Sequence, residues 1–113
     1  MRIGNLEIQL IHTPGHTPGS QCLYVKGKNG SEGVLVTGDT LFVGTIGRCD
    51  FPYSSPRDFY HSLGKLKKLD DSLTLYPGHD YGSSSIGTLG REKKTNPYLL
   101  ARTIEEFLQM VRH

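Results

Sequence analysis

The sequence predicts an α/β domain in which helices cover one face of a mixed β-sheet. Two observations predict this fold class. Four short segments have the apolar patterning of β-strands, and two longer segments are amphipathic and carry helix-start signals. They alternate in the order strand, two-stranded hairpin, loop, helix, strand, loop, helix. With 113 residues, of which 35% are hydrophobic and 21% are charged, the chain is long enough for one domain with a modest core.

The strands are predicted from alternation and from turn signals. Apolar and polar residues alternate in residues 6–12, the pattern of a half-buried strand. Residues 20–27 and 33–39 are rich in strand-forming side chains, and an Asn29-Gly30 pair between them favours a hairpin. Residues 72–79 form a fourth apolar run that a Pro-Gly pair interrupts.

Two helices are predicted, in residues 54–69 and 96–112. Each begins with a capping residue followed by proline, Ser55-Pro56 in the first and Asn96-Pro97 in the second, and each then shows apolar residues at helical spacing. Residues 80–94 are rich in Gly and Ser, so a long irregular loop is expected there. Long loops in compact domains are often functional.

Composition argues against several classes of protein. The net charge of +2 is small and the basic residues are scattered, which argues against nucleic-acid binding. No apolar run approaches the length of a membrane span, and no signal peptide is apparent. Cys22 and Cys49 are far apart in the sequence, so no disulfide framework is expected and a cytoplasmic location is predicted. Arg48 would favour a thiolate at Cys49, although a structural thiol is the more common situation.

Polar side chains follow the ends of several predicted strands. His12 ends the first strand and His16 lies in the Pro- and Gly-rich turn after it, while Asp39 and His79 end two others. Ligands of open α/β sheets bind beyond the carboxyl ends of strands. Imidazole nitrogen and carboxylate oxygen both coordinate Zn²⁺ and Fe²⁺, so these residues predict a metal site at this edge.

Four ordered motifs resemble those of a known family. The segments HTPGHTPGS, GDTLFVGTIGRCDFP, YPGHDYG and TLGREKKTNPYL occur in the order and with the spacing of the metallo-β-lactamase superfamily. The chain is most similar to the glyoxalase II-like and persulfide-dioxygenase-like branches. The resemblance extends through nearly all of the 113 residues.

The resemblance assigns metal ligands to three positions. His16 corresponds to the ligand in PGHT, Asp39 to the carboxylate that bridges two metals or completes an iron site, and His79 to the last ligand. Asp39 would also act in catalysis by positioning the nucleophile. His12 matches no ligand position and is interpreted as a structural or supporting residue.

The same resemblance assigns residues to the substrate pocket. Arg48 and Tyr81 correspond to residues that line a pocket for a thiol substrate, where a cation would meet a glutathione-type carboxylate. Asp50 and Asp80 are expected to orient loops and ligands. The implied substrate is a small-molecule thioester or a glutathione-type thiol.

One half of the family pattern is absent from the sequence. The HxHxDH motif that supplies the first metal ligands does not occur, so residues 1–113 correspond to the C-terminal αβ half of a four-layer αββα sandwich. The sheet face opposite the helices would then be exposed, beyond what monomers usually tolerate. A homodimer or a partner chain covering that face is therefore expected.

Three functions are compatible with these residues. The first is metal-dependent thioester hydrolysis resembling glyoxalase II, using Zn²⁺ or Fe²⁺, with little turnover by this chain alone because it supplies part of the site. The second is a persulfide dioxygenase-like iron enzyme. The third is a non-catalytic fragment that binds metal weakly and requires a partner.

Overall fold

The computed structural model describes residues 2–3, 6–26, 33–78 and 86–111. Its main sheet has the strand order β1-β2-β3-β4-β7-β8. These strands are β1 (Arg2–Ile3), β2 (Leu6–His12), β3 (Gln21–Lys26), β4 (Val34–Gly38), β7 (Thr74–Pro77) and β8 (Gly87–Thr88). Strands β4 and β7 are parallel, and the other neighbouring pairs are antiparallel, which confirms the mixed α/β sheet.

The predicted strands agree with the observed ones to within two residues at each end. The strand predicted in residues 6–12 is β2, and the other three predictions contain β3, β4 and β7. The short strands β1 and β8 were not predicted. Neither were β5 (Leu41–Phe42) and β6 (Thr45–Ile46), which form a separate hairpin between β4 and the first helix. Two-residue strands carry too little pattern for sequence analysis to find.

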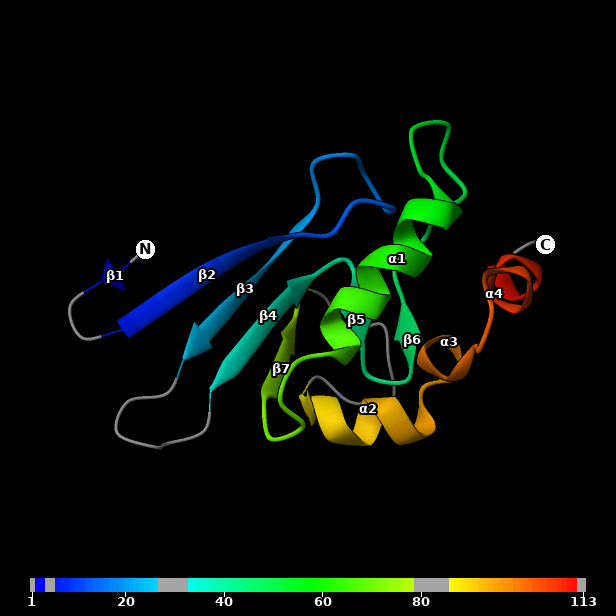
Figure 1. The fold of residues 1–113 in the computed structure, drawn as a ribbon. Helices are drawn as coiled ribbons and strands as arrows, with labels where there is room; N and C mark the ends of the chain where they lie inside the picture. Colours follow the sequence, from blue (N-terminus) through cyan, green and yellow to red (C-terminus); the bar gives the residue numbers. More distant parts are fainter. Residues whose placement is uncertain (1, 4–5, 27–32, 79–85, 112–113) are drawn as a thin grey trace.

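The first predicted helix is α1 (Pro56–Lys67), and its start is confirmed. The Ser55 hydroxyl accepts a hydrogen bond from the Asp58 amide at 3.2 Å, which satisfies a backbone donor of the first turn. Helix α1 packs in front of the sheet, whereas the β2–β3 hairpin extends beyond the helices (Figure 1). The core joins α1 to the sheet through Phe59, Leu63 and Leu66 with Cys22, Leu35 and Leu75. None of the described helices has the length and apolar content that crossing a membrane requires.

The prediction of one continuous C-terminal helix was wrong. The segment forms α3 (Pro97–Leu100) and α4 (Ile104–Val111), because Ala101 has an extended ψ of 125°. A new helix start follows, since the Thr103 hydroxyl accepts from the Glu106 amide at 3.2 Å, and the Glu106 carboxylate accepts from the Arg102 amide at 3.0 Å. This reciprocal capping carries the Thr-x-x-Glu signature in the sequence. The predicted cap at Asn96 is confirmed by its bond from the Tyr98 amide at 3.0 Å.

The expectation of an irregular segment at residues 80–94 was wrong for its second part. Strand β8 is followed directly by α2 (Leu89–Thr95), which the Thr88 hydroxyl caps by accepting from the Arg91 amide at 3.3 Å. The Gly90 amide donates to the Asp71 carbonyl at 2.9 Å, and Leu89 is fully buried. Tertiary contacts therefore stabilise a helix too short to show an apolar periodicity.

A buried polar pair connects α2 and α3 to the β5–β6 hairpin. Glu92 and Asn96 are 1% and 0% exposed. The Glu92 carboxylate accepts hydrogen bonds from the Gly44 amide at 2.8 Å and from the Asn96 side-chain amide at 3.0 Å. The same Asn96 amide donates to the Thr45 carbonyl at 3.1 Å. Because these buried groups satisfy one another, they fix the hairpin against the helices.

The sheet has two apolar faces, of which the described helices cover one. In the row facing α1, Tyr24, Leu35 and Leu75 are paired across β3, β4 and β7. The opposite face carries the paired row Leu10, Leu23, Val36 and Tyr76. On this face Leu10 is 51% exposed and Tyr76 is 43% exposed. Strand β2 therefore places Ile8 and Leu10 on the side away from the helices, whereas Ile11 pairs with the core residue Cys22.

Substituting Gly64 with alanine should stabilise the protein. Gly64 lies inside α1 and a Cβ there meets no atom within 4 Å, so the gain should be about 0.5–1 kcal/mol from helix propensity. Gly90→Ala is the matched control in α2, because its Cβ would lie 2.8 Å from the Asp71 Cβ. Urea unfolding should show stabilisation by the first change and destabilisation by the second. Equal effects would contradict the packing described for these helices.

Candidate metal centre

The turn that carries His16 is held by α1 and by the segment that precedes it. Three successive carbonyl groups of the turn accept hydrogen bonds. The pairs are Ser62 Oγ with Pro14 O (2.7 Å), Ser55 N with Gly15 O (2.8 Å) and Ser54 Oγ with His16 O (2.8 Å). The Lys65 ammonium also donates to the His12 carbonyl at 2.8 Å. The backbone of the turn is thus fixed by residues about 40 positions later in the sequence.

Gly15 allows this close approach. Its φ of +147° is one that side chains with a Cβ rarely adopt, and a Cβ at this position would collide with Phe59. The glycine in the PGH motif therefore allows the turn to pack directly on α1. This packing places His16 beside the carboxyl end of β4.

The imidazole of His16 is oriented by one short hydrogen bond. Its Nδ1 donates to the Arg48 carbonyl at 2.6 Å, because a carbonyl can only accept. The unprotonated nitrogen of the neutral ring is then Nε2. The side chain is 19% exposed, so the ring is largely enclosed. Metal-binding histidines commonly use this arrangement, in which one ring nitrogen donates to the protein and the other coordinates the ion.

Asp39 lies at the end of β4, next to the free nitrogen of His16. The distance from His16 Nε2 to Asp39 Oδ2 is 3.8 Å. Gly38, with φ of +52°, turns the chain out of the strand. The Gly78 amide donates to the Gly38 carbonyl at 2.7 Å, so the ends of the parallel strands β4 and β7 are joined at this point.

His16 and Asp39 fit a shared transition metal. Two donor atoms that each lie about 2.1 Å from one ion are at most about 4.2 Å apart, a limit that the observed separation satisfies. Their nitrogen and oxygen donors suit Zn²⁺ and Fe²⁺. Within the described residues, no group of three or more His, Cys, Asp or Glu side chains could hold a metal. The third predicted ligand, His79, lies in residues 79–85, outside the described part of the chain.

A cavity of about 350 Å³ opens beside these two residues. Its polar lining comes from His16, Asp39 and Arg48, and its apolar lining includes Phe42, Phe51 and Tyr53. The size and mixed lining are typical of small-molecule sites. Arg48 lines this cavity, and its role in binding a substrate stays a prediction. Tyr81, the other predicted pocket residue, falls outside the described residues, as does Asp80.

The Arg48 guanidinium is bound within the protein. It forms a two-point ion pair with Asp50, with both N–O distances at 3.0 Å, and it lies 4.4 Å from the centre of the Phe51 ring. Hydrogen bonding to Asp50 raises the pKa of Arg48 above its usual value. Asp50 thus contacts a residue of its own loop, and its role in orienting that loop stays a prediction.

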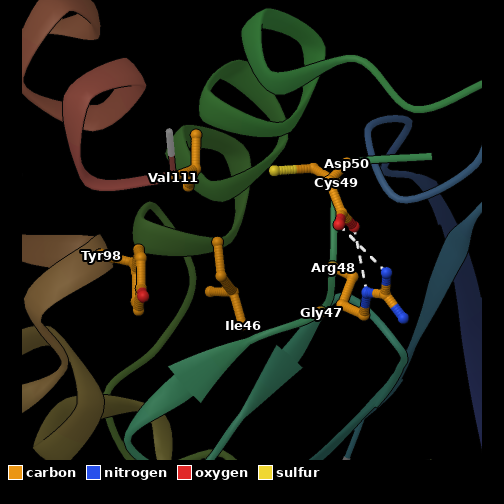
Figure 2. Close-up of a pocket in the computed structure, with 7 residues that line it drawn as sticks. All are labelled: Ile46, Gly47, Arg48, Cys49, Asp50, Tyr98 and Val111. Carbon is orange, nitrogen blue, oxygen red and sulfur yellow. Dashed lines mark hydrogen bonds and ion pairs between the residues drawn. The ribbon is translucent and has the colours of Figure 1, made fainter. Parts of the chain in front are cut away.

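A second cavity, of about 300 Å³, lies behind the loop that bears Arg48. Ile46, Gly47 and Arg48 line both cavities, so this segment separates them. Figure 2 shows the Cys49 sulfur and the Arg48 guanidinium pointing in opposite directions. Burial and the nearby Asp50 raise the pKa of the Cys49 thiol. The thiolate that Arg48 was expected to favour is therefore disfavoured.

His12 has a structural position, as predicted. Its Nε2 donates to the Pro18 carbonyl at 2.8 Å, which joins the two ends of the turn. At the next residue, the Thr13 hydroxyl lies 3.3 Å from the Thr40 hydroxyl and 3.6 Å from the Cys22 sulfur. These buried contacts connect the His16 turn to the segment after Asp39. Cys22 is accordingly a structural thiol, with its pKa raised by burial.

Sequence analysis missed several residues that shape the site. Phe51 packs edge-on against His16, with ring centres 5.9 Å apart and planes at 78°. A Cβ at Gly47 would collide with the Asp39 carbonyl. Ser54 and Ser62 were predicted only as part of the first helical segment, residues 54–69. Gly47 and Phe51 lie within the motif GDTLFVGTIGRCDFP, but no residue pattern indicates which neighbours they contact.

The family model for the metallo-β-lactamase superfamily matches residues 2–79, a range that includes the His16 turn and Asp39. The chain belongs to the metallo-β-lactamase superfamily. This confirms the resemblance and the fold expected from the four motifs. Because the match spans more than half of the 113 residues, it does not depend on any one motif.

Relatives in the superfamily are longer than this chain. An uncharacterized protein of Mycobacterium leprae is 45% identical over 98 residues, which are 86% of this chain and 42% of that protein. Glyoxylase B2 of Dictyostelium discoideum is 33% identical, over 96% of this chain and 38% of its own length. Hydroxyacylglutathione hydrolase of Prochlorococcus marinus is 29% identical, over 95% of this chain and 55% of its own length. The chain thus spans about half of these relatives or less.

Solved structures of the superfamily share the fold. A metallo-β-lactamase from Staphylococcus aureus superposes with a TM-score of 0.87 at 31% identity, over 98% of this chain and 36% of that one. ETHE1 from Myxococcus xanthus gives 0.85 at 34% identity, over 98% and 47%. A protein solved in a di-iron-bound form gives 0.71 at 36% identity, over 88% and 45%.

Gly47→Ala should destabilise the protein and disturb the site. The added methyl group would collide with the Asp39 carbonyl, and overpacking of this kind costs about 1–3 kcal/mol. Gly19→Ala is the control, because a Cβ in that turn meets no atom within 4 Å. Chemical unfolding should separate the two variants, and the NMR signals of His16 should shift in the first variant. Unchanged stability in Gly47→Ala would show that this contact is unimportant.

Proposed function

We propose that this chain contributes the second half of the metal site of a thioester hydrolase resembling glyoxalase II. The observation that supports the proposal is the arrangement of His16, whose Nδ1 is bound to Arg48 O while its Nε2 faces Asp39. His79 is proposed as a third ligand. It follows Gly78 in the sequence, and the amide of Gly78 is bound to the residue before Asp39.

The metal would be Zn²⁺ or Fe²⁺, held through His16 Nε2 and the Asp39 carboxylate. Such an ion polarises a carbonyl group and lowers the pKa of bound water. The chain's own contribution is to hold its donors in place and to enclose the acyl group in the cavity lined by Phe42, Phe51 and Tyr53. Asp39 would orient the attacking water. Breaking the C–S bond would then give a carboxylic acid and a thiol.

Arg48 and Tyr81 are proposed to bind the thiol portion of the substrate. Arg48 lines the cavity, and Asp50 occupies two of its five N–H donors. The remaining donors can bind a substrate carboxylate. The relatives named glyoxylase B2 and hydroxyacylglutathione hydrolase support a substrate of the glutathione thioester class.

Substitution of the proposed ligands should remove metal binding. In the intact protein, His16→Ala and Asp39→Asn should each weaken the binding of Zn²⁺ or Fe²⁺. Loss of a residue that only hydrogen-bonds to a ligand typically lowers metal affinity by about 10- to 100-fold, and loss of a ligand itself should lower it further. His61→Ala is the control, because His61 lies exposed on α1. Equilibrium dialysis measures the three affinities. Equal affinity in wild type and His16→Ala would refute the proposed site.

A persulfide dioxygenase is the second candidate, supported by the similarity to ETHE1 of Myxococcus xanthus. The two activities differ in metal and in co-substrate. One iron ion per chain, with oxygen consumed in the presence of a persulfide, would support the dioxygenase. Two metal ions per site with thioester cleavage would support the hydrolase. Absence of both activities in the intact protein would favour a non-catalytic fragment.

The apolar sheet face supports a partner. We propose that another αβ layer, either a second copy of the chain or a different polypeptide, covers the row Leu10, Leu23, Val36 and Tyr76. Gln9 and Leu10 lie on opposite faces of β2, and both are exposed. Leu10 lies on the open side with half of its surface exposed, which is unfavourable for an apolar side chain unless a partner covers it.

Leu10→Lys should weaken this association. Burying a leucine contributes about 1.5–3 kcal/mol, so replacing it with a charge should reduce affinity by about tenfold or more. Gln9→Lys is the control, since Gln9 is exposed on the other face of the same strand. Light scattering and sedimentation report the association state. A stable, soluble wild-type monomer at high concentration, unaffected by Leu10→Lys, would contradict the proposal.

A further inference from the structure

We infer that Asp50 and Phe51 are positioning residues for the imidazole of His16, Asp50 by holding Arg48 and Phe51 by packing against both the imidazole and the Arg48 guanidinium. This inference concerns the site proposed above, but it rests on contacts among the chain's own residues. Two parts of the segment 48–51 touch the ring of His16. The Arg48 carbonyl accepts from Nδ1, and the Phe51 ring meets the imidazole edge-on.

The Arg48 side chain connects these two contacts. Its guanidinium lies 4.4 Å from the centre of the Phe51 ring and is held by both carboxylate oxygens of Asp50 at 3.0 Å. A two-point arginine–carboxylate pair fixes direction as well as distance. The backbone carbonyl and the aromatic ring that orient His16 are therefore joined by the side chain between them.

A further contact extends this group of side chains outward. Tyr53 lies almost parallel to Phe51, with ring centres 5.3 Å apart and an interplanar angle of 13°. The Phe51 ring is thus bounded by the guanidinium, by Tyr53 and by the imidazole of His16. A ring with three such neighbours has little freedom to rotate, and this restricts the histidine as well.

The Arg48–Asp50 pair is exposed, which limits the size of the effect. The two side chains are 68% and 63% accessible, and exposed ion pairs contribute little to global stability. The inference therefore predicts a local change at His16 with nearly unchanged unfolding free energy. If these residues had a purely structural role, the substitutions would lower the unfolding free energy and leave His16 unchanged.

The test measures exchange of the His16 Nδ1–H proton with water by NMR in the intact, metal-free protein. Asp50→Asn should accelerate this exchange by about two- to fivefold, the range that corresponds to one exposed pair. Phe51→Leu should accelerate it by about two- to tenfold. Because Phe51 packs against the guanidinium that Asp50 holds, the two effects should be coupled, and the double variant should show less than their product. Metal affinity should fall in the same order.

Glu7→Gln is the matched control. Glu7 forms an exposed ion pair with Lys26 at 3.4 Å, at the other end of β2 from the His16 turn. This variant should leave the exchange of the His16 proton unchanged. If Asp50→Asn behaves like Glu7→Gln, or if the two site variants combine multiplicatively, the inference is wrong.

The outcome is separable from that of the proposed function. If the variants change proton exchange in a coupled way but the wild type binds no metal, the positioning role is supported and the metal site is rejected. Metal binding that is normal in the wild type and unchanged in Asp50→Asn and Phe51→Leu would retain the site and overturn the positioning role.

Discussion

The hydrogen bonds between the His16 turn and helix α1 determine the position of the rest of the site. Pro14 and Pro18 give the turn rigidity but have no N–H groups, and the carbonyls of Pro14, Gly15 and His16 accept hydrogen bonds from outside the turn. Serine and lysine side chains of α1 and the preceding segment donate to this part of the backbone. Gly15 makes this possible, because any side chain there would displace the helix. The imidazole is therefore placed by a helix far along the sequence.

The second support of the site is the segment between its two cavities. Residues 46–48 line both, and the carbonyl of Arg48 is the group that orients His16. Gly47 fits against the Asp39 backbone because it has no Cβ. Thus one short segment contacts the proposed nitrogen and oxygen ligands together. A substitution in either cavity that moves residues 46–48 would therefore change the position of His16 relative to Asp39.

Sequence patterns predicted the parts of the fold that local chemistry controls. The alternation in residues 6–12 and the Ser-Pro and Asn-Pro helix starts agree with the structure. The patterns failed where distant contacts decide. Helix α2 depends on Asp71 and on burial of Leu89, and the division between α3 and α4 depends on the Thr103–Glu106 cap. His16 and Asp39 were predicted as ligands from their places near strand ends, whereas the contact of Phe51 with His16 was not predicted, because it arises from three-dimensional neighbours.

The buried pair Glu92 and Asn96 makes the site depend on the C-terminal third of the chain. These side chains satisfy the amide of Gly44 and the carbonyl of Thr45 in the hairpin that leads into the Arg48 loop. Removing α2 and α3 would take away these hydrogen-bond partners of the hairpin backbone, and with them Tyr98, which lines the second cavity. Helices α2 and α3 thus support the Arg48 loop that contacts His16, although none of the proposed ligands lies within them.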